Sequence, residues 1–210
     1  MLTIKKIADL VNEIGATIHY YVFNKSANYN YIFYLKAISD SNKGTYESLS
    51  DIDKQKYIST SAQLYMPKLS VDGCARVYQD GTYEYEYTLD RVCKIIQPSK
   101  EDFNTAIILY MILHEFGHWN DFLLKDKKVY SYSMADYKQA KEVWDYKVKV
   151  QRELAFKTSY GKKDLEMLKN YTIKYNSVPS EQRANNYADE NYDKAFSILR
   201  KEGIVHSCSN

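Results

Sequence analysis

Apolar residues in the first third of the chain recur with two different spacings. Near the start they lie three or four positions apart, which predicts an amphipathic helix. The residues concerned are Leu2, Ile4, Ile7, Val11 and Ile14. Apolar residues at every second position predict strands over 17–23 and 31–38, joined as a β-hairpin. Residues 51–65 follow the capping residue Ser50 and precede Pro67, so they predict a second helix.

A second hairpin is predicted around Asp80-Gly81, because this pair readily adopts the positive φ angles of a tight turn. On the strand that follows, Tyr83, Tyr85 and Tyr87 alternate with polar residues and therefore share one face. These tyrosines either pack into the core or lie along an edge where an extended peptide substrate adds through main-chain hydrogen bonds.

The second half of the chain is predicted to be mainly helical. Residues 106–113 are uncharged and apolar on every side of a helix, so this segment has to be buried in the middle of the domain. Ser99 and Asp102 have the spacing of a capping box and mark the start of this helix, after a short strand over 91–96. Further helices are predicted over 133–157, 162–175 and 179–201. The whole pattern predicts an α+β fold, with a small mixed or antiparallel sheet packed on the buried helix and additional helices in the C-terminal half.

Composition narrows the class of protein. The 210 residues include 29 Lys and Arg against 27 Asp and Glu, a net charge of +2, and 45% of them are hydrophobic. These values fit one globular domain over 1–210 and exclude a basic nucleic-acid-binding arm, an acidic tail and a compositionally disordered chain. The 22 tyrosines either form a binding surface or reflect AT-rich codons, which Tyr shares with the abundant Lys, Asn and Ile.

The sequence contains no segment that predicts export or membrane insertion. Lys5 and Lys6 are not followed by an apolar run or a small-residue cleavage site. The most apolar segment, 106–113, is much shorter than the roughly 18 residues that span a bilayer. Three cysteines without close spacing argue against a disulfide framework and against a cysteine zinc site. We therefore expect a cytoplasmic protein without membrane contact.

The buried helix ends in the sequence His114-Glu115-Phe116-Gly117-His118, a His-Glu-x-x-His pattern. Residues four apart lie on one face of a helix, so both imidazoles can reach a single tetrahedral zinc ion. Glu115 lies on the neighbouring edge, where its carboxylate can take a proton from a water molecule but cannot readily bind the same ion. The alternative is a helix with a buried histidine and a surface ion pair.

A catalytic zinc site needs a third protein ligand and keeps one position open. Leu124 stands six residues after His118, where the metzincins have a third histidine, so that class is excluded. From Glu181 to Ala188 the last helix has its glutamate, two alanines and Asn185 on one face. In this arrangement Glu181 binds the metal, the alanines allow close helix packing, and Asn185 accepts a hydrogen bond from a ligand histidine. The alternative is that Glu181 only stabilises the first turn of its helix.

Together the two motifs resemble those of the gluzincin zinc peptidases, and among them the small intracellular proteins of the ImmA/IrrE and SprT types. The similarity covers residues 99–122 and 178–196. The resemblance implies a zincin fold in which the two histidines and Glu181 bind Zn²⁺. It also implies that Glu115 acts as the general base in the hydrolysis of peptide bonds.

The sequence departs from these families at two points. Asn185 stands where the larger gluzincin families carry Asp, which is closer to the ImmA/IrrE type. The segment over about 130–176 would be a helical insertion, whose role the resemblance does not cover.

We therefore predict a zinc metalloendopeptidase that acts on a protein or peptide substrate. The alternative is a non-catalytic, zinc-containing protein of peptidase-like fold that binds a protein or DNA partner through its helical insertion. Glu115 argues against this alternative, because a structural zinc site needs no general base. A third hypothesis is a helical interaction protein without metal. The net charge of +2 disfavours a nucleic-acid partner. The donor that would stabilise the oxyanion stays open among Arg183, His206 and the tyrosines.

Overall fold

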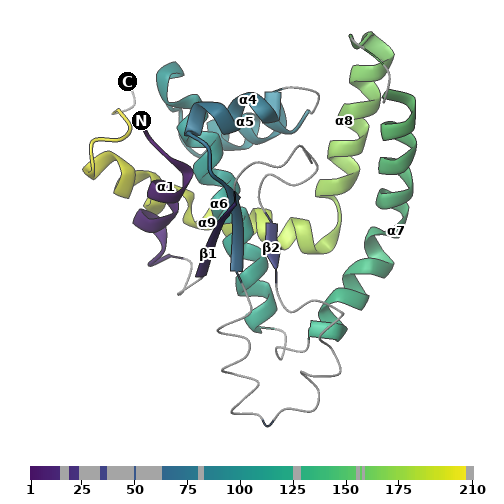
Figure 1. Ribbon diagram of the computed structural model, residues 1–210, viewed down its shortest axis with the longest axis horizontal. Helices are drawn as coiled ribbons and strands as arrows, with labels where there is room; N and C mark the ends of the chain where they lie inside the picture. Colours follow the sequence, from purple (N-terminus) through teal and green to yellow (C-terminus); the bar gives the residue numbers. More distant parts are fainter. Residues whose placement is uncertain are drawn as a thin grey trace.

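The computed structural model describes residues 1–14, 19–23, 34–36, 50, 63–79, 83–124, 129–154, 157 and 159–206. In chain order the elements are α1 (Ile4–Val11), β1 (His19–Phe23), β2 (Tyr34–Lys36), β3 (Gln63–Pro67), α4 (Val71–Gln79), α5 (Glu84–Ile95), the 3-10 helix η2 (Lys100–Asp102), α6 (Phe103–Leu124), α7 (Val129–Leu154), α8 (Lys162–Asn176) and α9 (Pro179–Lys201) (Figure 1).

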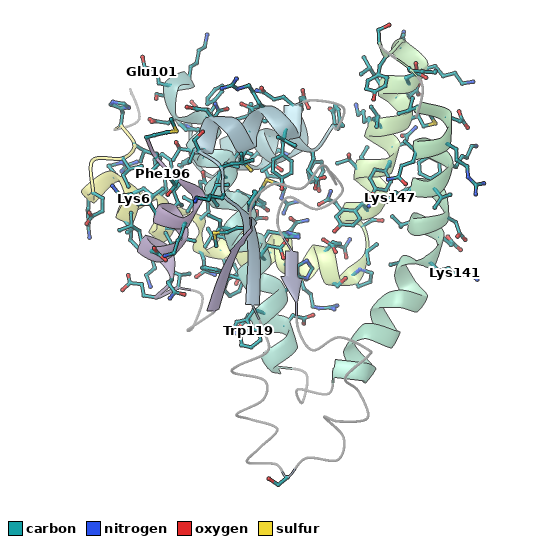
Figure 2. The ribbon with its side chains drawn as sticks, viewed as in Figure 1. Lys6, Glu101, Trp119, Lys141, Lys147 and Phe196 are labelled. Carbon is teal, nitrogen blue, oxygen red and sulfur yellow. The ribbon has the colours of Figure 1, made fainter. Side chains whose placement is uncertain are left out.

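Helix α6 forms the centre of the molecule. Over 106–113 all side chains except that of Met111 are buried, so the expectation of a helix buried on every side is essentially confirmed. Helix α9 packs along α6, and α4, α5 and α1 also contact it (Figure 1). Besides Tyr192, the largest completely buried side chain that α9 contributes to this core is that of Phe196 (Figure 2).

Helix α1 covers one side of this core, as its spacing predicts. Ile4, Ile7 and Val11 are completely buried, and the side chain of Thr3 caps the helix by accepting a hydrogen bond from the backbone N–H of Lys6. Since these residues lie three or four positions apart, one face of α1 supplies the whole contact.

Helices α7 and α8 lie side by side and project from the rest of the molecule (Figure 1). They have a small core of their own, formed by Val150, Leu154 and Leu168 and flanked by partly buried side chains that include Tyr83 and Tyr146. The predicted helices over 133–157 and 162–175 are thus confirmed, apart from the residues around 155–158. We call this pair the helical arm.

The predicted α+β fold class is wrong, because the described residues are mostly helical. The strands are short, with 5, 3 and 5 residues, and the element that packs most extensively on α6 is the helix α9. The alternating segments that favoured a larger sheet belong partly to helices.

The predicted hairpin over 17–23 and 31–38 is also wrong. In the three-stranded sheet β3 lies between β1 and β2, parallel to β1 and antiparallel to β2. Alternation of apolar residues predicts a strand but does not identify its neighbour, which is why the pairing was missed. Residues 63–65, predicted as the end of a helix, belong to β3, and the rest of that helix (51–62) lies outside the described residues.

The second predicted hairpin is replaced by two helices, α4 and α5, and the turn residues 80–82 lie outside the described residues. In α5 the buried residues are Tyr85, Thr88 and Val92, which have the three- and four-residue spacing of a helix face. Glu84 and Glu86 in its first turn complement the helix dipole. Since α5 runs to Ile95, the predicted strand over 91–96 is wrong as well.

None of the described helices has both the length and the apolar character that crossing a bilayer requires.

Candidate metal centre

Helices α6 and α9 approach each other very closely at Gly117, inside the His-Glu-x-x-His motif. A Cβ atom at this position would lie 2.7 Å from both the Cα and the carbonyl oxygen of Ala184, and 3.0 Å from the Cβ of Tyr187. Ala184 and Ala188 are completely buried in the contact. Because any larger residue at Gly117 would meet backbone atoms, the close approach depends on both the glycine and the small residues of α9.

This close approach brings His114, His118 and Glu181 together. The Oε2 atom of Glu181 lies 3.0 Å from Nε2 of His114 and 3.4 Å from Nε2 of His118. The two Nε2 atoms are 3.1 Å apart, and the rings meet edge to face. Glu181 is buried and the histidines are partly buried, so this His-His-Glu group could hold a metal ion.

The hydrogen bonds of His114 direct its Nε2 atom toward Glu181. Nδ1 of His114 lies 2.9 Å from Oδ1 of Asn185, and the amide nitrogen of Asn185 donates to Oδ1 of Asn176 over 2.9 Å. Nδ1 must therefore carry a proton, so a neutral His114 has a lone pair on Nε2. That lone pair faces the Glu181 carboxylate, and a proton or a metal cation is needed to bind both.

The electrostatics of Glu181 agree with this arrangement. Burial by itself raises the pKa of the Glu181 carboxyl, but the attraction of His118 and the contacts with both histidines outweigh burial and hold the pKa below its ordinary value. The carboxylate is consequently charged at neutral pH, which is the form that binds a metal ion.

A series of buried hydrogen bonds between amide groups ends at Nδ1 of His114. Asn185 accepts from His114 and donates to Asn176, and the amide nitrogen of Asn176 donates to the carbonyl oxygen of Thr172 over 2.9 Å. Asn185, Asn176 and Thr172 are all buried. We call this chain of hydrogen bonds, from Thr172 through Asn176 and Asn185 to His114, the amide chain. It ties α8 of the helical arm to the candidate metal centre.

The sequence predicted Asn185 as a partner of a ligand histidine but missed Asn176. Asn176 is the last residue of α8, within the segment predicted as a helical insertion, whose role the resemblance does not cover. A buried asparagine at the end of a helix resembles an ordinary C-terminal residue, so no local signal marked it.

Glu115 shares its surroundings with two further side chains that sequence analysis missed, Glu84 and Tyr175. Burial raises the pKa of Glu84, as do Glu181 and Glu115, whereas His114 and Lys147 lower it. The pKa of Tyr175 is raised by burial first and then by carboxylates that include Glu181 and Glu115. The start of α5 and the end of α8 are therefore close enough to the centre to interact with it electrostatically, and Lys147 of α7 interacts in the same way with Glu84.

The three tyrosines predicted along a substrate-binding strand do not form an edge. Tyr83 precedes α5 and packs against the core of the helical arm. Tyr85 donates from its hydroxyl to Asn104 over 3.0 Å, and the Tyr87 hydroxyl is 3.4 Å from Nη1 of Arg91. Since Tyr85 and Tyr87 belong to a helix, whose main-chain groups bond within the helix, the basis for main-chain addition of a peptide at this segment is lost.

Two of the candidate oxyanion donors are engaged elsewhere. Arg183 donates from Nε to Asp121 over 2.8 Å. His206 contacts Asp102 through its backbone N–H and its ring, and Asp102 lies at the start of α6, roughly 18 Å along the helix from His114.

Comparisons with known proteins found no match: no family model, no curated protein and no solved structure matches the chain.

Proposed function

We propose that this protein is a zinc-dependent peptidase that cleaves peptide bonds in a protein or peptide substrate. The observation that carries the proposal is the convergence of His114, His118 and Glu181 on one point, with Glu115 in the next helical position. Two imidazoles and one carboxylate are a donor set typical of catalytic zinc sites, which leave one position open. Within the described residues these are the only side chains that form such a group.

When bound there, zinc supplies a Lewis acid that activates water and polarises the scissile carbonyl group. The protein's own residues do the rest of the chemistry. Glu115 takes the proton from the attacking water and transfers it to the leaving amine. The amide chain keeps the Nδ1 proton on His114, so that its Nε2 lone pair stays directed at the site.

Tyr175 is the donor that we assign to the developing negative charge on the substrate oxygen. It is partly buried, interacts electrostatically with Glu181 and Glu115, and carries a hydroxyl that is protonated at neutral pH, since burial raises its pKa further above the ordinary value. Arg183 and His206 are held elsewhere by Asp121 and Asp102.

The test compares Glu115→Gln with the wild-type chain, using elemental analysis for zinc and cleavage of unfolded casein for activity. We expect Glu115→Gln to keep zinc and to lose about 100-fold or more in cleavage rate, because the base is removed and the ligands stay. His114→Ala should lose zinc as well as activity.

Glu101→Gln is the matched control. Glu101 is an exposed glutamate before α6 (Figure 2), so this variant should retain both zinc and activity. Full cleavage activity in Glu115→Gln would refute the proposed mechanism. A chain that binds no zinc would refute the proposal as a whole.

A further inference from the structure

A polar pocket of about 480 Å³ lies between α5, α8 and α9, next to the amide chain. Asn176 and Asn185 form part of its wall, together with Arg91, Gln182 and Asn186. Neither His114 nor Glu181 lines it. The pocket is therefore separate from the candidate metal centre but shares Asn185 with it.

The hydrogen bonds beside this pocket leave an N–H donor available on each of its two buried amides. Oδ1 of Asn185 accepts from His114, and Oδ1 of Asn176 accepts from Asn185. Each of these buried amides donates one N–H to a protein partner, so each retains a second N–H. The two buried side chains of the wall thus each offer a hydrogen-bond donor.

Arg91 adds further donors and a positive charge. Its guanidinium bonds to Tyr110 over 2.8 Å, to Asp189 and, more weakly, to Tyr87. A guanidinium has more N–H groups than these partners accept. Asp189, which pairs with Arg91, is not among the pocket's lining residues, and no lining residue within the described part of the chain is acidic.

We propose that this pocket binds the carboxylate group of a small organic acid. A carboxylate accepts several hydrogen bonds and matches the planar donor geometry of a guanidinium. The volume is sufficient for a small ligand, near the lower limit of typical ligand pockets. Gln182 and Asn186, both exposed at the rim, supply further amide groups to the ligand.

The same geometry couples the pocket to the metal centre. A carboxylate that accepts from Asn185 or Asn176 restrains the amide whose oxygen holds the Nδ1 proton of His114. Bound acid should therefore strengthen zinc binding, and zinc should strengthen acid binding by the same factor. This second statement rests on the proposed zinc site, whereas acid binding itself does not.

The experiment measures thermal unfolding of the zinc-free chain in sodium succinate, with sodium chloride at equal ionic strength as reference. We expect Tm to rise by about 3 °C at a succinate concentration about ten times the dissociation constant. The side-chain amide signals of Asn176 and Asn185 in nuclear magnetic resonance spectra should shift along the same titration. No response to succinate, or a response to inorganic phosphate alone, would overturn the proposal.

Two variants test the location of binding. Gln182→Glu combined with Asn186→Asp changes two exposed amides to carboxylates of nearly equal size, and should weaken succinate binding at least tenfold by repulsion. The control is Gln151→Glu, the same chemical change at an exposed position of α7, which should bind succinate like the wild type. Equal binding by the double variant and the control would refute the pocket as the site.

Arg91→Lys keeps the positive charge but loses the planar donor set, so we expect several-fold weaker binding. Its Tm without succinate shows whether the fold is retained.

The two proposals fail independently. If the wild-type chain binds succinate but no zinc, the pocket is supported and the peptidase proposal fails. If zinc binds and succinate does not, the reverse conclusion holds.

Discussion

Two pairs of helices in this protein differ sharply in how they pack. Helices α6 and α9 meet through completely buried residues. At Gly117 they are so close that a Cβ atom would overlap the backbone of Ala184. Among the side chains that the structure describes, helices α7 and α8 share a core of three buried apolar residues, flanked by partly buried side chains that are mostly aromatic. The side chains that could hold a metal ion all come from the first pair, and the arm contributes a hydrogen bond through Asn176.

The difference indicates why the candidate site is built where it is. A metal site needs ligand atoms held within a few tenths of an ångström, and densely packed helices give that precision. A small core such as that of the helical arm permits local opening without unfolding of the rest. The arm can therefore move or loosen at little cost, while α6 and α9 can separate only if the centre of the molecule unfolds.

The largest expected difference in stability is between two variants that each add one methyl group, one in each helix pair. Gly117→Ala places a Cβ 2.7 Å from backbone atoms of Ala184, so α6 and α9 must move apart. We expect a loss of about 3 kcal/mol in the free energy of unfolding, measured by chemical denaturation. At Gly161 a Cβ would meet only Asp164, at 3.7 Å, so Gly161→Ala should change stability by less than about 1 kcal/mol. Equal effects would show that the α6–α9 contact yields easily.

The amide chain links the two regions. Substituting either of its asparagines tests how much this link contributes to zinc affinity. Asn185→Ala removes the acceptor of His114 and a donor to Asn176. Zinc affinity, measured by competition with a chromophoric chelator, should fall about 10- to 100-fold. Asn185→Asp retains the acceptor and should keep most of the affinity. Asn176→Ala acts one step further away and should cost less than Asn185→Ala; a larger cost would make the arm the main support of the centre.

A cavity in the core of the helical arm should have only local consequences. Leu168→Ala removes one of its three buried apolar residues, and we expect a loss of about 2 kcal/mol. Amide hydrogen exchange should become faster in α7 and α8 and remain slow in α6. Leu165→Ala, at a position of α8 that is 52% exposed, is the control and should have almost no effect. Faster exchange throughout α6 would contradict the separate stability of the two regions.

The smallest expected effect is a dependence of the arm on pH. Asp164 receives hydrogen bonds from Lys157 and from the backbone N–H of Gly161, and both lower its pKa. A carboxyl whose pKa is lower in the folded state adds stability above its unfolded pKa of about 4, and this contribution is lost as the pH falls below that value. Exchange in the first turn of α8 should therefore increase in this range, and less so in Asp164→Asn. The same profile in both chains would exclude Asp164 as the cause.

Predictions from the sequence succeeded where a signal lies within one helix. The uniform apolar run over 106–113 predicted a buried helix, and the spacing of His114 and His118 placed both on one face. They failed over 77–89, where Tyr83, Tyr85 and Tyr87 alternate like a strand although the buried residues of α5 recur with helical spacing. Alternation over a few residues fits both structures, and only the surroundings select one.

Helix α9 shows the same limit of sequence-based prediction. Glu181 and Asn185 were found because they share one face of a helix with two small residues. Asn176, Glu84 and Tyr175 were not found, because they lie on α8 and α5, away from the two helices that carry the motifs, and their meeting with the site depends on how these helices pack.

What the sequence determined by itself is local: the helical faces, the pair of histidines around Glu115, and the small residues of α9. The tertiary structure alone decided that β3 separates β1 from β2, that α5 replaces a strand, and that the arm reaches the metal centre through Asn176. Periodicity reports which side of an element is buried, but it does not report against which partner. Partners are selected by packing over the whole core, such as the contact of Gly117 with Ala184.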